Sequence, residues 1–309
     1  MADADPLLGG TKSDMPILYN TDSSYFSMIV RMALEEKGVK WINREMDIHS
    51  KMEQFQPWYV SISPGICVPT LMHKDTAVPE SLDILRYVDS AFDTGIALTP
   101  AGAGERATMD ISVAERFIQE AYSFDVEAFT MGYAADWNPI FARLGPKIIG
   151  GTIPKLEKMK AERPQLAQVC DRKIAQNKRR IADIFGPPNG LAKGLASFKV
   201  ALEKLEQQLV ASSGPYICGN QFTLADVVFT NLLCRGNWIA PGRQAIAEKP
   251  SVTRYWQEVQ KRPAFASARL QPSVPIGKLR GMLLQKLCKC CGCVLALAAL
   301  AVAALHFVH

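Results

Sequence analysis

Two neighbouring residues, Glu80 and Ser81, stand directly before a helical pattern and offer a carboxylate and a hydroxyl group there. A helix N-terminus presents unpaired N–H groups and partial positive charge, which suit a carboxylate ligand. Ser81 can add a hydroxyl donor, and Glu80 can bind an ammonium group. Together these groups predict binding of a small molecule that carries an α-amino-acid end. The alternative is a helix cap without a ligand.

Val68 and Pro69 could supply a second part of such a site. Residues 68–71 and 78–81 flank a polar tip at residues 73–75, and this pattern predicts a β-hairpin. Proline cannot donate to a sheet ladder, so Pro69 fits an edge or a special turn. A cis bond before Pro69 would turn the backbone of Val68 outward. Its N–H and C=O groups would then pair with an extended peptide ligand, as an added strand does.

The hairpin and the helix after it resemble the glutathione-binding half of the glutathione transferases. The resemblance rests on Val-Pro-Thr-Leu at residues 68–71 and on Glu-Ser-Leu-Asp-Ile-Leu-Arg-Tyr-Val-Asp at residues 80–89. It covers about residues 15–268. An extended basic segment at about 137–190 and the run at 30–38 resemble two relatives in particular. These are the plant tetrachlorohydroquinone-dehalogenase-like class and the ganglioside-induced differentiation-associated proteins.

This resemblance implies that glutathione is the cosubstrate and assigns roles to the residues named above. The backbone of Val68, beside Pro69, would pair with the cysteinyl unit of glutathione. Glu80 and Ser81 would bind its γ-glutamyl end. The predicted glutathione site therefore consists of one backbone segment and one helix N-terminus.

Position 67 departs from the pattern of the family. Relatives often carry a basic or amide residue just before the Val-Pro pair, where it reaches the glycyl carboxylate, and here that residue is Cys67. Either His49 or Lys51 compensates, or the affinity for glutathione is weak. Cys67 could form a mixed disulfide with glutathione, but a free cysteine more often behaves as a small buried hydrophobe.

Glutathione chemistry requires a thiolate, so the pKa of the thiol must fall from about 8.5. A hydroxyl group at the start of the helix predicted over residues 25–37 would donate to the sulfur, and the helix dipole would add to the effect. The candidates are Ser23, Ser24, Tyr25 and Ser27. By resemblance, Ser24 falls on the serine of the serine-type transferases. The alternative is that Ser24 acts only as an N-cap, which serine favours.

A thioredoxin-like domain over residues 15–93 must position these groups. The order of apolar runs and helical patterns predicts strand, helix, strand, helix, strand, strand and helix. The predicted elements are a strand at 16–20, a helix at 25–37, a strand at 39–46, a short helix at 51–60, the hairpin, and a helix from 82 to about 92. The expected fold class is an α/β thioredoxin-like domain followed by an all-α domain, with a transmembrane helix at the C-terminus.

After a Gly-, Pro- and Ala-rich linker, residues 103–270 are expected to form the all-helical domain, with the basic insertion at about 137–190. Thr223 and Asp226 have the spacing of a capping box, which is a folding signal. The helical domain would line the pocket of the electrophile, including Tyr122, Phe129 and Trp137. Aromatic residues at helical spacing, however, are more often core.

The chain has 309 residues, with 35 Lys and Arg against 30 Asp and Glu, giving a net charge of +5. The excess of basic residues lies in residues 137–195 and 273–309. The sequence has no zinc-finger spacing, RNP motif or basic–aromatic interleaving, so we expect no nucleic-acid partner. Four scattered cysteines fit reduced cytosolic thiols. Four clustered cysteines at 288–293 suit palmitoylation and fit a metal site poorly.

The residues near the C-terminus, 290–308, are almost all apolar. Residues 1–14 are expected to be a disordered leader and residues 271–289 a basic linker. Residues 290–308 form an apolar run of about the length that crosses a bilayer, with basic residues before it. This pattern predicts a single-pass tail anchor, with the body of the protein in the cytosol. The mitochondrial outer membrane is favoured, with the endoplasmic reticulum or a plastid envelope as alternatives.

The sequence is compatible with two functions of different classes. The first is a membrane-tethered, serine-type glutathione transferase that conjugates or reductively dehalogenates a hydrophobic electrophile. The second is a tail-anchored adaptor that keeps the fold without catalysis and acts in organelle membrane organisation. The expected partners are glutathione, the electrophile and membrane lipid. By resemblance to relatives that dimerise, a homodimer is also expected.

Overall fold

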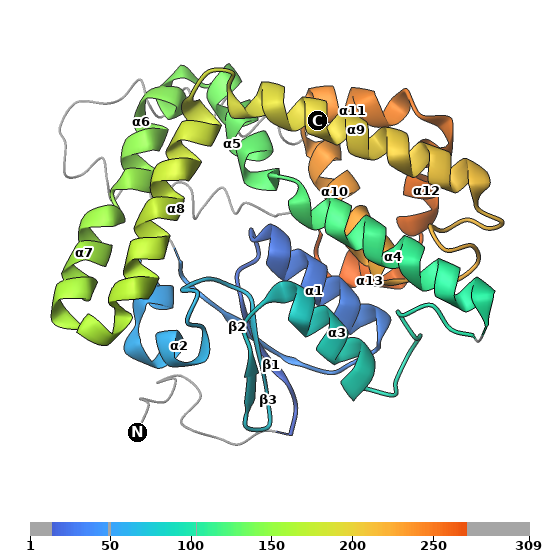
Figure 1. Cartoon of the computed structure of the whole chain (residues 1–309), viewed down its shortest axis with the longest axis horizontal. Coiled ribbons are helices and arrows are strands. Elements are labelled where there is room, and N and C mark those ends of the chain that lie inside the picture. The colour runs from blue at the N-terminus through green and yellow to red at the C-terminus, as the bar shows by residue number, and fades with distance from the viewer. Residues whose placement is uncertain (1–13, 49–50, 103, 271–309) are drawn as a thin grey trace.

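A computed structural model of the chain describes residues 14–48, 51–102 and 104–270. In these residues a small α/β domain is followed by a helical domain (Figure 1). The first domain has the order of elements that the sequence predicts. Its elements are β1 (Ile17–Asn20), α1 (Tyr25–Glu36), β2 (Ile42–Glu45), the 3₁₀ turn η1 (Glu53–Phe55), α2 (Pro57–Ile62), β3 (Thr70–His73), β4 (Thr76–Val78) and α3 (Ser81–Ala91).

The four strands form one sheet in the order β2-β1-β3-β4. Strand β1 pairs parallel with β2 and antiparallel with β3, and β3 pairs antiparallel with β4. Leu18 of β1 packs with Val30 of α1 and Ile84 of α3. The next residue, Tyr19, packs with Trp58 of α2. Because successive side chains of a strand point to opposite faces, α1 and α3 cover one face of the sheet and α2 covers the other.

Two local predictions in this domain have different outcomes. The hairpin is confirmed, since β3 and β4 are joined at Lys74 and Asp75. The single short helix expected over residues 51–60 is instead the turn η1 followed by α2. Gln56 is extended between these two elements, as a residue before proline prefers, and Pro57 then starts α2.

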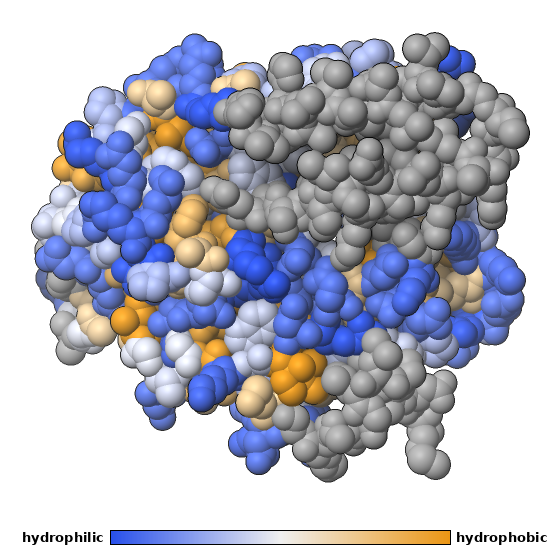
Figure 2. All heavy atoms as spheres, turned by 180° about the vertical axis from the view of Figure 1, so that it is seen from behind, coloured by the Kyte–Doolittle hydropathy of each residue, from blue (hydrophilic) through white to orange (hydrophobic). Residues whose placement is uncertain are grey.

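The second domain consists of helices, and on the face that Figure 2 shows its hydrophobic residues lie in small separate groups among hydrophilic ones. This is the surface expected where amphipathic helices turn their apolar faces inward. Its elements are α4 (Glu105–Ser123), α5 (Val126–Trp137), α6 (Pro139–Gly150), α7 (Ile153–Glu162), the 3₁₀ turn η2 (Pro164–Leu166), α8 (Ala167–Phe185), α9 (Gly190–Ala211), α10 (Leu224–Trp238), α11 (Ala240–Ala247), α12 (Pro250–Val259) and α13 (Pro263–Ser267).

Helix α10 lies at the centre of the core, and its start confirms the predicted capping box. The backbone N–H and the hydroxyl of Thr223 both donate to Oδ2 of Asp226, at 2.8 and 2.9 Å. Oδ1 of Asp226 accepts from the N–H of Ile217 at 3.0 Å and from the hydroxyl of Tyr255 at 3.1 Å. Burial raises the pKa of Asp226 to about 6, and these donors oppose the rise.

Helices α6 to α8 occupy the basic insertion of the sequence, and α8 reaches back to the first domain. In Figure 1, α8 runs beside α7 toward α2. Cys170 and Ile174 of α8 share an apolar cluster with Val60 of α2 and with Ile66 in the loop before β3. The insertion therefore packs on the first domain at the loop that leads to Val68.

The transmembrane helix expected at residues 290–308, and the membrane localisation that followed from it, must be corrected. In the part of the chain that the structure describes, no helix is both long enough and apolar enough to cross a bilayer. Residues 290–308 lie outside the described residues. An apolar run does not by itself identify a span: α10 is buried almost throughout, yet it is a core helix of the second domain.

Asp89 near the end of α3 connects the two domains, and this leads to a pH prediction. Its carboxylate accepts from the N–H groups of Leu98 and Thr99, each at 2.8 Å, and lies 3.4 Å from Nζ of Lys37. Burial raises the pKa of Asp89, but these donors and the ammonium lower it below its ordinary value overall. Asp89 therefore stabilises the fold above about pH 4, and its contribution is lost as the pH falls through the lower pKa of the folded state.

We expect Asp89→Asn to lower the free energy of unfolding by about 1 kcal/mol at neutral pH and to make it less sensitive to acid below about pH 4. Urea denaturation at a series of pH values measures both effects. Asp93→Asn is the matched control, because Asp93 is an exposed aspartate just beyond α3. Equal acid sensitivity in the wild type and in Asp89→Asn would contradict the prediction.

Candidate functional site

The segment before β3 leaves the backbone of Val68 without a hydrogen-bond partner in the described part of the chain. The peptide bond between Val68 and Pro69 is cis. The carbonyl of Cys67 accepts from the hydroxyl of Tyr59 at 2.7 Å and from that of Ser63 at 3.0 Å. The N–H and C=O groups of Val68 make no hydrogen bond with another residue among those described. They can therefore pair with a ligand.

Glu80 and Ser81 lie at the start of α3, as predicted. Glu80 is the N-cap residue and is exposed, and its side chain makes no capping hydrogen bond. Ser81 is buried, and its hydroxyl lies 3.0 Å from the hydroxyl of Tyr122 in α4. Burial raises the pKa of Tyr122 to about 12, so its phenol stays neutral and keeps a proton to donate. This contact fixes Ser81 at the point where the two domains meet.

Gly65 shows how close the two predicted parts of the site are. A Cβ atom on Gly65 would lie 3.2 Å from Sγ of Cys67 and 3.6 Å from Oε1 of Glu80. The Glu80 carboxylate is therefore a neighbour of the loop that leads to Val68. The structure thus brings the predicted backbone segment and the predicted helix N-terminus together.

The four candidate hydroxyl groups at the start of α1 differ in exposure. Ser24 is the N-cap residue and is half-buried, and its Oγ accepts from the N–H of Ser27 at 3.3 Å. Ser23 is exposed, and Ser27 is fully buried. Tyr25 is buried as well, and burial raises its pKa far above the ordinary value. Ser24 alone of the four combines the helix N-terminus with partial exposure, and its role stays a prediction.

The compensation for Cys67 by His49 or Lys51 stays a prediction. His49 lies outside the described residues, and Lys51 is exposed. Burial raises the pKa of the Cys67 thiol, while the ammonium of Lys173 lowers it. Because the pKa of this thiol is above its ordinary value overall, Cys67 is a poor nucleophile at neutral pH.

Lys173 belongs to α8, and its approach to the site could not be predicted from the sequence. It lines a pocket of about 450 Å³ between the first domain and α8. The first domain contributes Pro64, Gly65, Pro79 and Glu80, and α8 contributes Val169, Arg172, Lys173 and Gln176. The only signal in the sequence was the basic character of the insertion, which does not indicate which of its residues faces the site.

The three aromatic residues expected to line the electrophile pocket lie in different parts of the helical domain. Phe129 is fully buried in the core of the helical domain. Trp137 is 38% exposed at the end of α5. Tyr122 contacts Ser81, as described above. Of the three residues, only Tyr122 therefore lies at the predicted glutathione site.

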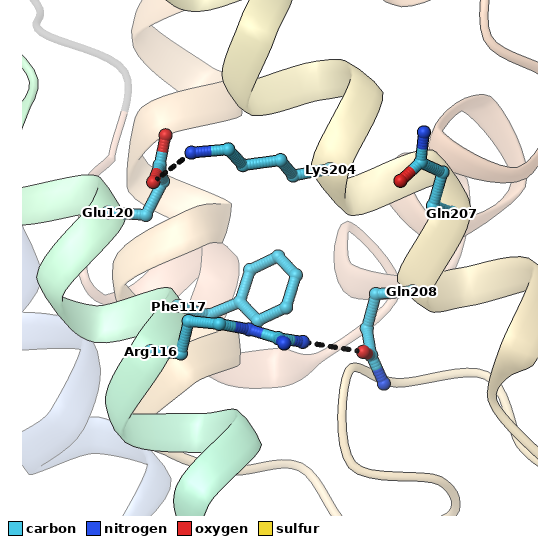
Figure 3. Close-up of a pocket in the computed structure, with 6 residues that line it drawn as sticks. All are labelled: Arg116, Phe117, Glu120, Lys204, Gln207 and Gln208. Carbon is cyan, nitrogen blue, oxygen red and sulfur yellow. Dashed lines mark hydrogen bonds and ion pairs between the residues drawn. The ribbon is translucent and has the colours of Figure 1, made fainter.

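A second pocket, of about 330 Å³, lies between α4 and α9 (Figure 3). Nη2 of Arg116 donates to Oε1 of Gln208 at 3.1 Å, and Nζ of Lys204 lies 2.6 Å from Oε2 of Glu120. Phe117 also lines this pocket. Each charged side chain of this pocket therefore has a polar partner in its lining, and none of the predicted site residues lines it.

Two family models of known proteins match this chain, one in each of its two domains. The family model described as "Glutathione S-transferase, N-terminal domain" matches residues 23–91. The model described as "Glutathione S-transferase, C-terminal domain" matches residues 196–267. The first range contains α1 to α3, and the second contains most of α9 and all of α10 to α13. Helices α4 to α8 lie between the two matches.

Three curated relatives are similar over most of the chain. The tetrachloro-p-hydroquinone reductive dehalogenase of Sphingobium chlorophenolicum is 26% identical over 83% of this chain and 96% of its own. The glutathione S-transferase TCHQD of Arabidopsis thaliana is 24% identical over 80% and 87%. The human ganglioside-induced differentiation-associated protein 1-like 1 is 23% identical over 81% and 72%.

The solved structures show the same fold. Glutathione S-transferase III in its apo form covers 84% of this chain and 98% of its own, with a TM-score of 0.56 at 21% identity. The predicted combination of a thioredoxin-like domain and an all-α domain is thereby confirmed. The predicted homodimer is not tested by a single chain. Both domains match glutathione S-transferase family models, and the fold matches that of a solved glutathione S-transferase. The chain therefore belongs to the glutathione transferase superfamily, whose cosubstrate is glutathione.

Proposed function

We propose that this protein is a serine-type glutathione transferase that attacks a chlorinated aromatic electrophile of the hydroquinone kind. The observation that supports this most strongly is the meeting of an unpaired Val68 backbone with Glu80 and Ser81 at the start of α3. An extended tripeptide with one α-amino-acid end fits these groups. The printed names of the two dehalogenase-like relatives support the choice of electrophile.

Each group has one role in the proposed complex. The N–H and C=O of Val68 pair with the cysteinyl unit of glutathione, which fixes its sulfur near the start of α1. Ser81 and the N-terminus of α3 hold the γ-glutamyl carboxylate, and Glu80 holds the ammonium. Ser24 donates a hydrogen bond to the sulfur and stabilises the thiolate.

The first chemical step is the same for conjugation and for dehalogenation. The thiolate sulfur forms a bond to the ring carbon that carries chlorine, the carbon–chlorine bond breaks, and chloride leaves with the electron pair. Conjugation ends there. In reductive dehalogenation, a second glutathione thiolate attacks the sulfur of the conjugate. The ring carbon takes a proton, and glutathione disulfide leaves as the oxidised product.

Loss of the Ser81 hydroxyl tests the glutathione site. We expect Ser81→Ala to weaken glutathione binding about 10-fold or more, because a hydrogen bond to a charged ligand group is lost in a buried position. Calorimetric titration of the full chain measures the affinity. Ser90→Ala is the matched control on the same helix, because Ser90 is exposed and donates only to the carbonyl of Tyr87.

The wild type and Ser90→Ala should bind alike. Equal affinity in Ser81→Ala would show that α3 does not hold the ligand. If the folded wild type binds no glutathione, the transferase proposal fails. The alternative of an adaptor that keeps the fold without catalysis would then explain the chain better.

A further inference from the structure

Lys173 is a cation that has no partner among the described residues, and it lies at the edge of the proposed glutathione site. It lies in α8, and its side chain is only partly exposed. Among the residues that the structure describes, it makes no hydrogen bond and no ion pair. An ammonium that is partly removed from water without a compensating partner costs free energy. Unpaired polar groups of this kind therefore call for an explanation, and a ligand is one.

The packing of α8 fixes the direction from which Lys173 approaches. The next residue, Ile174, is buried against Val60 and Ile66 of the first domain, together with Cys170 one turn earlier. This apolar contact holds α8 against the loop before β3. Lys173 consequently lines the pocket that this loop forms with the start of α3.

The electrostatic surroundings of Lys173 agree with this position. Burial lowers its pKa, while the nearby Cys67 and Glu80 raise it. The same two residues flank Gly65 in the wall of the pocket. The ammonium thus faces the segment that leads to Val68, although it comes from a helix of the other domain.

The charges around the pocket match those of glutathione. Glutathione carries two carboxylates and one ammonium at neutral pH. The pocket has one carboxylate, on Glu80, and two cations, on Arg172 and Lys173. Glu80 is assigned to the ammonium of glutathione. The α3 N-terminus satisfies one carboxylate, which leaves a carboxylate for a cation of α8.

We propose that Lys173 binds a carboxylate of glutathione, so that α8 completes a glutathione site that the first domain leaves open beside Cys67. This inference rests on the proposed function. It makes the insertion between the two matched domains a part of the binding site. Lys173 is preferred to Arg172 because Arg172 is exposed, whereas the ammonium of Lys173 is partly withdrawn from water.

Titration of the full chain with glutathione tests the proposal. We expect Lys173→Gln to weaken binding about 10-fold or more, the loss expected for a hydrogen bond between charged groups. Lys173→Arg, which keeps the charge, should retain most of the affinity. Lys178→Gln removes the same charge from an exposed position of the same helix and should bind as the wild type does.

One further ligand identifies the carboxylate. If Lys173 holds the glycyl carboxylate, Lys173→Gln should not change the affinity for the glycyl ethyl ester of glutathione, which lacks that charge. If Lys173 holds the γ-glutamyl carboxylate, Lys173→Gln should weaken binding of this ester as well. The melting temperature without ligand should stay unchanged or rise in Lys173→Gln, because an unpaired cation is removed. A purely structural role would lower it.

The outcomes separate this inference from the proposed function. Normal binding in the wild type and in Lys173→Gln would overturn the role of Lys173 and leave the transferase proposal intact. An equal loss in Lys178→Gln would also overturn it, because the effect would then be one of net charge. Absence of binding in the wild type would overturn both.

Discussion

Replacing Ser24 by alanine should lower kcat/KM with an aryl halide about 100-fold, while the affinity for glutathione changes little. The expected cause is a rise of roughly 2 units in the pKa of the bound thiol, because its hydrogen-bond donor is lost. The Oγ atom of Ser24 already accepts from the N–H of Ser27, so its own proton is available to the sulfur. The lost N-cap should also cost about 1 kcal/mol of stability.

The ultraviolet absorbance of the thiolate, recorded against pH with glutathione bound, gives this pKa directly. Ser24→Thr keeps both the cap and the donor, and it should retain a low thiol pKa. Ser23→Ala is the control, because Ser23 is the exposed neighbour. An unchanged thiol pKa in Ser24→Ala would remove Ser24 from the mechanism, and a shift in Ser23→Ala would point to the neighbouring hydroxyl instead.

Arg31→Met should lower the free energy of unfolding by about 4 kcal/mol. Arg31 is fully buried in α1, and its guanidinium reaches the end of the helical domain. Its Nε donates to the carbonyl of Ala268 and its Nη1 to Oδ1 of Asn20, both at 2.8 Å. Its Nη2 lies 3.3 Å from the carbonyls of Asp22 and Arg269. Methionine has a similar length but would leave these acceptors without a donor.

Urea denaturation measures this loss as a lower midpoint urea concentration, with a similar dependence of the unfolding free energy on urea. Arg86→Met is the matched control in α3. Arg86 forms an ion pair with Glu115 in which both side chains are about half exposed. Such surface pairs contribute little, so Arg86→Met should stay within about 0.5 kcal/mol of the wild type. A similar small change in Arg31→Met would show that the guanidinium does not tie the two domains together.

Short sequence motifs predicted the turns and helix starts that neighbouring residues determine. The hairpin followed from two short runs around a polar tip, and the capping box followed from the spacing of Thr223 and Asp226. The Asn138-Pro139 pair is a signal of the same local kind, because Asn138 caps α6 and Pro139 is its first residue. By contrast, the apolar residues between 109 and 131 keep a helical spacing although the chain breaks there, where Asp125 begins α5 by accepting from the N–H of Ala128.

The sequence could not predict contacts between segments that lie far apart in the chain. In α1, Arg31 looks like an ordinary helix residue, because its partners at 268 and 269 are more than two hundred residues away. Lys173 was one of many cations in a basic segment, and only the packing of Ile174 on α2 selects it for the pocket. The C-terminal run was interpreted from its composition alone, and an apolar composition is shared by membrane spans and core helices.

Chloride release from tetrachloro-p-hydroquinone by the full chain, with glutathione in excess, tests the central claim most directly. We expect release that depends on the protein, saturates with glutathione and falls in Ser24→Ala. The sulfur product, either a glutathione conjugate or glutathione disulfide, then distinguishes conjugation from reductive dehalogenation. Chloride release no faster than in protein-free glutathione would contradict the claim that this chain is a transferase for such electrophiles.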